Sequence, residues 1–321
     1  MLHSKLTVAL VLIALAMSGC ASLPSDGGGD VTLVVLHAGS LSVPVKGFIE
    51  AYQQDHRNVT FLTEAAGSRT TARKVSELGR EADLVLSADY LVLDELLIPD
   101  FAGWNIRFAR NEMVIAYTAS SRYADEITSE NWYEILLRPD VVYGHSDPNA
   151  DPCGYRTLMV WQLAERHYGI AGLSERLDEH CPPENVRPKE TDLIALLESG
   201  DMDYAFEYRS VAIQHGLNYV TLPPEINLSE PQLADAYREA TVEVSGREPG
   251  TTTTLVAVPI VYGLTIPRNA PHPDEAQAFV RFILGPEGQA ILEEAGQSPL
   301  VPPLATGEVP AELADLVERV D

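Results

Sequence analysis

The stretch VTLVVLHAGSLSVPVKGFIEAYQQ at residues 31–54 decides the fold class. Residues 31–37 form a continuous apolar run, which is typical of a buried parallel strand. A turn at 38–41 follows, and apolar side chains then recur at the spacing of one helical face over residues 43–54. A strand, a short turn and an amphipathic helix in this order predict a layered α/β protein.

Similar units follow along the chain. Residues 58–64 and 83–87 are predicted strands, with a predicted helix at 69–78 between them. Repeated β–α units of this kind predict a parallel sheet covered by helices on both faces.

The middle of the chain predicts a second lobe. An apolar strand at 112–118 is expected to cross into this lobe, and a return strand within 252–267 to cross back. Between them we predict helices at 131–137, 155–167 and 192–198 and strands at 141–144, 204–208 and 219–222. The chain then returns to the first lobe with helices at 273–284 and 286–294.

The predicted α/β fold therefore has two discontinuous lobes. Residues 31–111 and 263–321 are expected to form lobe 1, and residues 112–262 to form lobe 2. Ligands of open α/β sheets bind outside the carboxyl ends of the strands, so we expect the ligand in the cleft between the lobes. Hinge motion at the crossovers, 112–118 and 261–267, is expected to close that cleft.

The first 30 residues are predicted to be a targeting segment. The apolar run at 6–17 follows Lys5 and is too short to span a membrane. The sequence MSGC at 17–20 then resembles a lipobox, which predicts a lipoprotein signal peptide at 1–19, lipidation of Cys20 and a flexible tether at 20–30. The protein is therefore expected outside the cytoplasm, anchored to the outer face of the membrane. The alternative is a plain signal peptide with an incidental cysteine.

The charge of the chain is strongly acidic. The formal net charge is −25, and removal of Lys5 with the signal peptide makes it −25 − 1 = −26. Lysine is scarce, and arginine supplies most of the positive charge. This balance favours a protein adapted to high salt, with an ordinary acidic secreted protein as the alternative. Nucleic acid is an unsuitable partner for such a surface, and an anionic ligand would need a local site built from N–H groups.

Two turns offer such a site. Gly39 and Ser40 follow the first predicted strand and open a helix, and Gly67 with Ser68 repeats the arrangement after the second. Free N–H groups and a hydroxyl at a helix N-terminus bind anions. Each turn alone could equally be a plain helix cap.

A third segment, SDPNADPCGYR at 146–156, enters a long predicted helix. Pro152 suits its first turn and Asp151 its N-cap, while the carboxylate and the following N–H groups could also face the cleft. Cys153 and Cys181 could form a disulfide outside the cell, which the sequence leaves open. The sequons at Asn58 and Asn227 likewise leave glycosylation open.

Motifs of enzymes are missing from the sequence. It contains no G-x-S-x-G, H-E-x-x-H or P-loop motif, and its histidines lack the paired spacing of metal ligands. The sequence therefore predicts a binding protein without catalytic residues or a cofactor, rather than an enzyme or signalling module on the same lobed fold.

Six stretches in order resemble one known family. They are HAGSLSVP, AAGSRTTARKVSELGREADLVLSADY, WNIRFARNEMVIAYT, SDPNADPCGYR, VRPKETDL and DYAFEYRSVAIQHGLNYVTLPPEINL. Together they resemble the archaeal-type tungstate/molybdate-binding proteins, the substrate receptors of ABC importers, over residues 36–304. The resemblance implies a type II periplasmic-binding-protein fold and a monomer that delivers its oxyanion to a membrane permease driven by an ATPase.

The resemblance also implies a set of site residues. Carried over position by position, the oxyanion site would use Gly39, Ser40, Ser68, Asp151, Pro152, Cys153, Glu190 and Tyr208. In this family two carboxylates approach the metal of the oxyanion, and Asp151 and Glu190 match those positions. Such a site would reject sulfate and phosphate, which do not expand their coordination in this way. A receptor for sulfate, phosphate or a small organic anion is the alternative, and the choice between tungstate and molybdate stays open. The segment between Cys153 and Glu190 is shorter than the family pattern, so the edge of lobe 2 is expected to differ.

Overall fold

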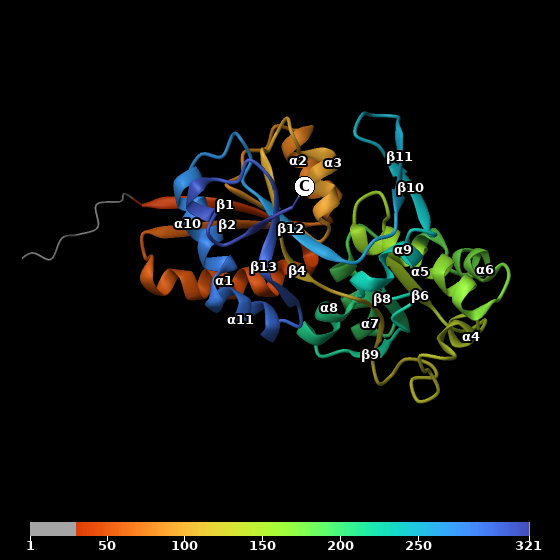
Figure 1. Ribbon diagram of the computed structural model, residues 1–321. Coiled ribbons are helices and arrows are strands. Elements are labelled where there is room, and N and C mark those ends of the chain that lie inside the picture. Colours follow the sequence, from red (N-terminus) through yellow and green to blue (C-terminus); the bar gives the residue numbers. More distant parts are fainter. Residues whose placement is uncertain (1–29, 321) are drawn as a thin grey trace, which may run out of the picture.

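The computed structural model describes residues 30–320 and consists of two α/β lobes side by side (Figure 1). Lobe 1 is built on a seven-stranded sheet and lobe 2 on a five-stranded sheet. The predicted signal peptide, Cys20 and nearly all of the predicted tether lie outside the described residues.

The sheet of lobe 1 has the strand order β14-β13-β4-β12-β3-β1-β2. Its strands are β1 (Val31–Ala38), β2 (Val59–Ala66), β3 (Leu84–Ser87), β4 (Trp104–Arg110), β12 (Val261–Thr265), β13 (Ser298–Gly307) and β14 (Glu318–Arg319). β1 pairs in parallel with β2 and β3, as predicted. The sheet as a whole is mixed, because β12 runs antiparallel to β3 and β4, and β13 runs antiparallel to β4. The antiparallel β12 brings the chain back from lobe 2 beside the strand by which it left.

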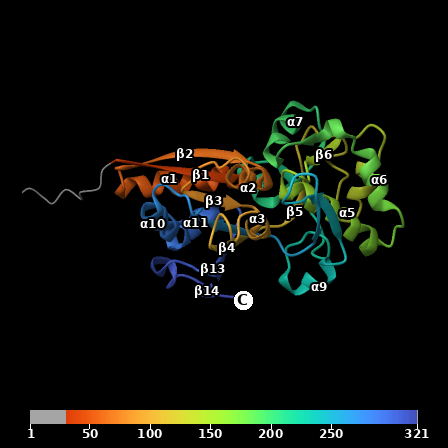
Figure 2. The same ribbon diagram turned by 90° about the horizontal axis from the view of Figure 1, so that it is seen from above.

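Helices cover both faces of this sheet. They are α1 (Ser42–Asp55), α2 (Ser68–Ser76), α3 (Tyr90–Leu96), α10 (Pro273–Leu284) and α11 (Pro286–Glu294). Side chains alternate along β1, so Leu33 and Val35 pack with α1 and α10 while Leu36 packs with α2 and α3. Figure 2 shows α2 and α3 nearer to lobe 2 than α1, α10 and α11.

Lobe 2 has the strand order β7-β6-β8-β5-β9. Its strands are β5 (Met113–Tyr117), β6 (Tyr143–Ser146), β7 (Val186–Arg187), β8 (Tyr204–Tyr208) and β9 (Asn218–Thr221). Its helices are α4 (Trp132–Leu136), α5 (Pro152–Tyr168), α6 (Leu173–His180), α7 (Ile194–Ser199), α8 (Arg209–Gln214) and α9 (Ala234–Tyr237). Trp132, Trp161 and Phe206 form an aromatic core on one face of the sheet. Short 3₁₀ turns include η1 (Gly39–Leu41) and η3 (Glu190–Asp192).

A β-hairpin, which the sequence did not predict, extends from lobe 2 toward lobe 1. It consists of β10 (Thr241–Ser245) and β11 (Thr252–Val256), paired antiparallel. In Figure 1 it stands opposite α2 and α3. Arg69 and Arg73 of α2 donate to its Ser245 carbonyl at 2.6 and 3.0 Å, so the hairpin is tied to lobe 1.

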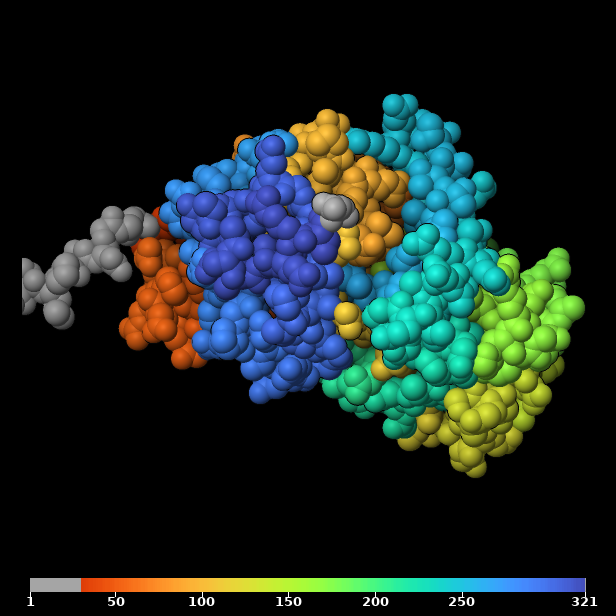
Figure 3. All heavy atoms as spheres, viewed as in Figure 1, coloured from red at the N-terminus to blue at the C-terminus, as the bar shows by residue number. Residues whose placement is uncertain are grey.

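The first crossover, between β4 and β5, lines a groove between the lobes. Arg110, Glu112 and Arg209 line this groove together with Glu230 and Ser298. Figure 3 shows it as the hollow between the blue and teal surfaces. Among residues 30–320, no helix is long and apolar enough to cross a membrane.

Two questions that the sequence left open concern single side chains. Cys153 and Cys181 are both buried and unbonded to each other. Asn227 is buried and its amide donates to a Glu112 carboxylate oxygen at 2.9 Å, so the folded protein does not offer this sequon for glycosylation, whereas Asn58 is exposed.

Candidate functional site

The lobes are in direct contact beside the predicted site. The Ala150 carbonyl, just before α5, accepts the Arg69 and Thr70 N–H groups of α2 at 3.1 and 3.2 Å. A Cβ atom added to Gly67 would lie 2.4 Å from the same carbonyl oxygen. The N-terminus of α2 in lobe 1 therefore rests against the turn that begins α5 in lobe 2.

Each glycine turn of lobe 1 faces one acidic turn of lobe 2. A Cβ atom on Gly39 would lie 2.9 Å from one Glu190 carboxylate oxygen and 3.0 Å from the other, and a Cβ atom on Gly67 would lie 2.9 Å from the Cβ of Asp151. Only glycine allows approaches this close. The structure thus brings together the predicted residues of both lobes, and all of them are buried, namely Gly39, Ser40, Ser68, Asp151, Pro152, Cys153, Glu190 and Tyr208. Their part in binding stays a prediction.

Asp151 joins two of these turns. As predicted, it caps α5, where one carboxylate oxygen accepts the Cys153 N–H at 3.2 Å and Pro152 opens the helix. The other oxygen accepts the Glu190 N–H at 2.8 Å. Because a carboxylate offers about four lone-pair sites, Asp151 can hold both turns and still donate to a ligand.

Glu190 carries a carboxylate that the protein leaves unsatisfied. Its side chain is 1% exposed, and neither oxygen has a hydrogen-bond partner among the described residues. Burial raises the pKa of Glu190 well above its ordinary range, and the charge of Asp151 raises it further. Buried polar atoms are nearly always paired, so an unpaired buried carboxylate against the opposite lobe is a candidate ligand-binding group.

Glu207 is a third buried acid, which the sequence reasoning did not assign to the site. It is 0% exposed, and both of its oxygens lack a partner in the part of the chain that the structure describes. Burial raises the pKa of Glu207 well above its ordinary range, and the nearby Asp151 charge adds to this effect. The signal was present in the sequence, because Glu207 is the one charged residue of the otherwise apolar strand YAFEY.

We expect Glu207→Gln to stabilise the ligand-free protein at pH 8 by about 1–3 kcal/mol, because glutamine has no charge to bury and needs no proton to remain neutral in the folded protein. A raised folded pKa means that the folded protein keeps a proton that the unfolded chain loses above its ordinary pKa of 4.5. Glu207 therefore destabilises the fold increasingly as the pH rises, and the gain from glutamine should shrink toward pH 5. Thermal unfolding at both pH values measures this, with the exposed Glu198→Gln as the control. An unchanged Tm at pH 8 would contradict it.

The predicted hydroxyl groups do not cap their helices. Ala38 and Gly67 occupy the N-cap positions of η1 and α2, and neither Ser40 nor Ser68 makes a side-chain cap bond. Instead, the Ser68 oxygen accepts the Ala88 N–H at 2.9 Å, and the Ser40 oxygen accepts the Tyr262 hydroxyl at 3.0 Å. The Tyr208 hydroxyl oxygen accepts a hydrogen bond from the Arg156 guanidinium at 2.7 Å. Tyr262 and Arg156 were not assigned from the sequence.

The Cys153 side chain is a structural part of this region. It is fully buried, and its thiol lies 3.5 Å from the Phe206 carbonyl oxygen. Burial raises the pKa of Cys153 well above its ordinary range, and the nearby acids, led by Glu207, reinforce this. A thiol in this state is protonated and unreactive at neutral pH.

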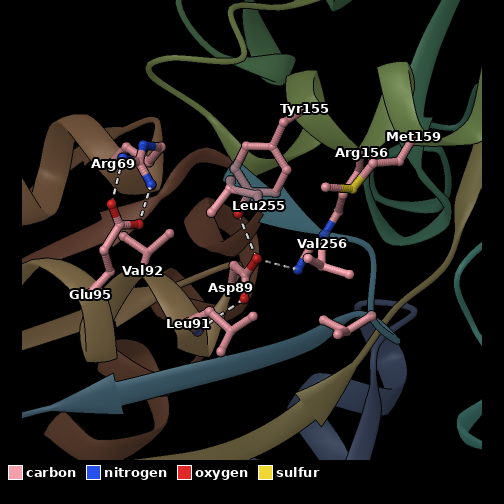
Figure 4. Close-up of a pocket in the computed structure, with 11 residues that line it drawn as sticks. Arg69, Asp89, Leu91, Val92, Glu95, Tyr155, Arg156, Met159, Leu255 and Val256 are labelled. Carbon is pink, nitrogen blue, oxygen red and sulfur yellow. Dashed lines mark hydrogen bonds and ion pairs between the residues drawn. The ribbon is translucent and has the colours of Figure 1, made fainter. Parts of the chain in front are cut away.

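Polar contacts between the lobes continue in a crevice beside the site (Figure 4). Asp89 of lobe 1 accepts the Tyr155 hydroxyl at 2.5 Å and pairs with the Arg156 guanidinium at 3.0 Å. Arg69 pairs with Glu95 at 2.7 Å in the same crevice. Each of these charged side chains has at least one partner of opposite charge, whereas the carboxylates of Glu190 and Glu207 have no hydrogen-bond partner within residues 30–320. The unpaired oxygens of Glu190 lie where the two lobes meet, so a ligand bound to them would contact both lobes.

Comparison with known proteins shows the family of this chain. A family model described as bacterial extracellular solute-binding protein matches residues 33–297. The chain belongs to this family. The solute-binding protein is 53% identical to an uncharacterized solute-binding protein of Petrotoga mobilis, with 94% of each chain covered. It is 43% identical to the molybdate/tungstate-binding protein WtpA of Thermococcus kodakarensis, with 98% of this chain and 96% of that one covered. The predicted family resemblance is thereby confirmed, as is the prediction of a binding protein rather than an enzyme.

Solved structures share the fold of this solute-binding protein. The periplasmic molybdate-binding protein of Azotobacter vinelandii has a TM-score of 0.60 at 17% identity, over 84% of this chain and 99% of that one. The sulfate-binding protein SubI of Mycobacterium tuberculosis has a TM-score of 0.59 at 16% identity, over 89% and 90%. These likenesses confirm the predicted two-lobed α/β fold.

Among residues 30–320, no group of three or more histidine, cysteine, aspartate or glutamate side chains is arranged to hold a metal ion. The expectation that the protein works without a cofactor stays a prediction.

Proposed function

We propose that this solute-binding protein captures tungstate or molybdate outside the cytoplasm and delivers it to an ABC importer. The observation that carries the proposal is the pair Asp151 and Glu190, two buried carboxyl groups that face the glycine turns of the opposite lobe. Relatives named molybdate/tungstate-binding protein, 42–43% identical over nearly the whole chain, support the same ligand.

The chemistry of the pair explains the choice of ligand. Two carboxylates beside a bound dianion repel it unless their oxygens donate directly to its central atom. The hexavalent metal of tungstate or molybdate is a hard acceptor that can take oxygens from both Asp151 and Glu190 and become six-coordinate. Sulfur and phosphorus do not take them, so sulfate and phosphate would meet only the repulsion.

Calorimetric titration of the mature protein tests this proposal. We expect tight binding of tungstate and molybdate and affinity at least about 100-fold weaker for sulfate and phosphate, since two unrelieved repulsions together exceed about 2.7 kcal/mol. Equal affinity for sulfate and molybdate would overturn the six-coordinate site. Titration of one oxyanion into protein saturated with the other would rank tungstate against molybdate.

The proposed anchor is a lipid on Cys20, which would hold a monomer near the permease and its ATPase. The lipobox-like MSGC at 17–20 and the glycine-rich segment after it support this placement. Cys20→Ser should leave the protein uncleaved or release it, whereas the wild type partitions into detergent and incorporates labelled fatty acid. Absence of label in the wild type would favour a plain signal peptide.

The acidic surface is proposed to be an adaptation to high salt. The net charge is −25, so the acidic side chains repel one another strongly at low ionic strength. Salt screens this repulsion, since the Debye length falls from about 10 Å at 0.1 M to about 3 Å at 1 M salt. The Tm should therefore rise on transfer from 0.1 to about 1 M potassium chloride. A Tm independent of salt would favour an ordinary acidic secreted protein.

A further inference from the structure

The three hydroxyl groups of the site share one feature. Each oxygen accepts a hydrogen bond from a buried donor of the protein: Ser40 from the Tyr262 hydroxyl, Ser68 from the Ala88 N–H and Tyr208 from the Arg156 guanidinium. A hydroxyl has a single proton to donate. Because its oxygen already accepts from the protein, each proton remains available to an anion in the site.

The direction of the bond to Ser40 follows from its neighbours. The side-chain oxygen of Asn111, Oδ1, accepts the Glu112 backbone N–H at 3.0 Å, which fixes the orientation of the Asn111 side-chain amide. The Asn111 nitrogen therefore donates to the Tyr262 oxygen at 2.9 Å, and the Tyr262 proton is left to donate to Ser40 at 3.0 Å. Burial raises the pKa of Tyr262, so its hydroxyl keeps that proton at neutral pH. The hydrogen-bond chain thus runs from Asn111 to Tyr262 to Ser40, and each residue donates a hydrogen bond to the next one toward the site.

This chain starts at the crossovers between the lobes. Asn111 lies between β4 and β5, in the first crossover, and Tyr262 lies in β12, in the second. The Asn111 nitrogen also donates to the Ser210 hydroxyl of lobe 2 at 2.7 Å. The hydrogen bond that orients Ser40 thus depends on how both crossovers are held.

The bond to Tyr208 depends on contact between the lobes. Arg156 belongs to α5 of lobe 2, but it also donates to the Ala88 carbonyl of lobe 1 at 2.9 Å and pairs with Asp89 at 3.0 Å. Its side chain is 2% exposed, so these partners hold the guanidinium in place. Separation of the lobes would remove two of its three partners.

We propose that Tyr262 and Arg156 are positioning residues that hold the Ser40 and Tyr208 hydroxyl groups as hydrogen-bond donors to the bound oxyanion. Neither residue needs to touch the anion. Each acts through the hydroxyl whose oxygen it occupies, and each ties that hydroxyl to the closed arrangement of the lobes. The inference rests on the proposed function, because the oxyanion is the acceptor of both protons.

A double-mutant cycle on Tyr262 and Ser40 tests this inference. The variants are Tyr262→Phe, Ser40→Ala and the double variant, each titrated with molybdate by calorimetry. We expect Tyr262→Phe to weaken molybdate binding about tenfold, which is the effect of losing one hydrogen bond to a charged group. In the Ser40→Ala background the same change should have no further effect, since the hydroxyl that it orients is gone. A purely structural role for Tyr262 would weaken binding equally in both backgrounds and overturn the proposal.

Controls separate this outcome from misfolding and from failure of the proposed function. Tyr262→Phe keeps the aromatic ring, and thermal unfolding verifies the fold. Tyr237→Phe is the matched control, because it removes another buried tyrosine hydroxyl, bonded to the Pro224 carbonyl in lobe 2, and should leave molybdate affinity unchanged. If the wild type binds no molybdate or tungstate, the proposed function itself fails; if it binds them and the cycle is additive, only this inference fails.

The same design applies to Arg156. Arg156→Lys keeps a positive charge beside Asp89, but one ammonium group does not reproduce the guanidinium fork that reaches both lobes. The substitution should weaken molybdate binding more in the wild-type background than in a Tyr208→Phe background. An equal loss in both backgrounds would show that Arg156 acts only by holding the lobes together.

Discussion

Glu190→Gln should weaken tungstate binding by at least about 100-fold and, at the same time, stabilise the ligand-free protein at pH 8. Both effects have one cause. The Glu190 carboxylate is buried beside Asp151 and has no hydrogen-bond partner among residues 30–320, so it destabilises the protein until its oxygens bind a ligand. Glutamine has nearly the same shape as glutamate but carries no charge. It therefore removes the destabilisation and also removes the carboxylate oxygen that is proposed to coordinate the tungsten atom of tungstate.

The pH dependence of this variant has a definite sign. Since the folded pKa of Glu190 is raised, the folded protein retains a proton that the unfolded chain loses above its ordinary pKa of 4.5. The stability gain from glutamine should be largest at pH 8 and should diminish toward pH 5. Thermal unfolding and calorimetric titration of the same samples measure both effects.

The exposed Glu198→Gln in the same lobe is the control and should alter neither property. If Glu190→Gln lowers the Tm and leaves tungstate binding intact, Glu190 is a structural acid with a partner, and the proposed site is wrong. If it stabilises the protein without affecting binding, Glu190 resembles Glu207, and the ligand lies elsewhere.

Local pattern was sufficient for the elements that carry the site. The apolar run of β1, the glycine turns and the Asp151-Pro152 start of α5 each have a signal within a few residues. β13 has no such signal, since SPLVPPLATG reads as a loop. It pairs with β4 on both sides of a shift in register between Pro299 and Leu304, and the prolines in this interval have no N–H to donate to a neighbouring strand. The hairpin β10–β11 was missed because its two short strands, TVEVS and TTTLV, contain few apolar residues and pair only with each other among the described strands.

The site itself was only partly predictable. The positions of Asp151 and Glu190 came from motifs that resemble a family, and their proximity to Gly67 and Gly39 is a result of the three-dimensional fold. Tyr262 is 222 residues from Ser40 in sequence, and no local pattern relates them. Such pairings depend on the return of the chain through the second crossover, which one sequence does not specify.

Gly67→Ala is the second substitution with a large expected effect, because it should block closure of the lobes without harming either one. The backbone at Gly67 has φ −57° and ψ 143°, which alanine adopts without strain. The added methyl group would nevertheless lie 2.4 Å from the Ala150 carbonyl oxygen and 2.8 Å from its carbon. Both are backbone atoms of the opposite lobe, so the overlap is relieved only by moving the lobes apart.

Tungstate affinity should therefore fall at least about 100-fold in Gly67→Ala, since Asp151 and the turn at Ser68 no longer meet around the anion. Small-angle scattering should show that tungstate compacts the wild type but leaves the variant extended. The Tm of the ligand-free variant should hold or rise slightly, because alanine lowers the conformational entropy of the unfolded chain and so stabilises the folded state by about 0.4–1 kcal/mol. Gly103→Ala is the matched control, as its new methyl group would meet only the flexible end of Arg268, at 3.4 Å. Normal affinity and compaction in Gly67→Ala would mean that the anion binds without the contact between Gly67 and Ala150, and the site would then have to be placed wholly within one lobe.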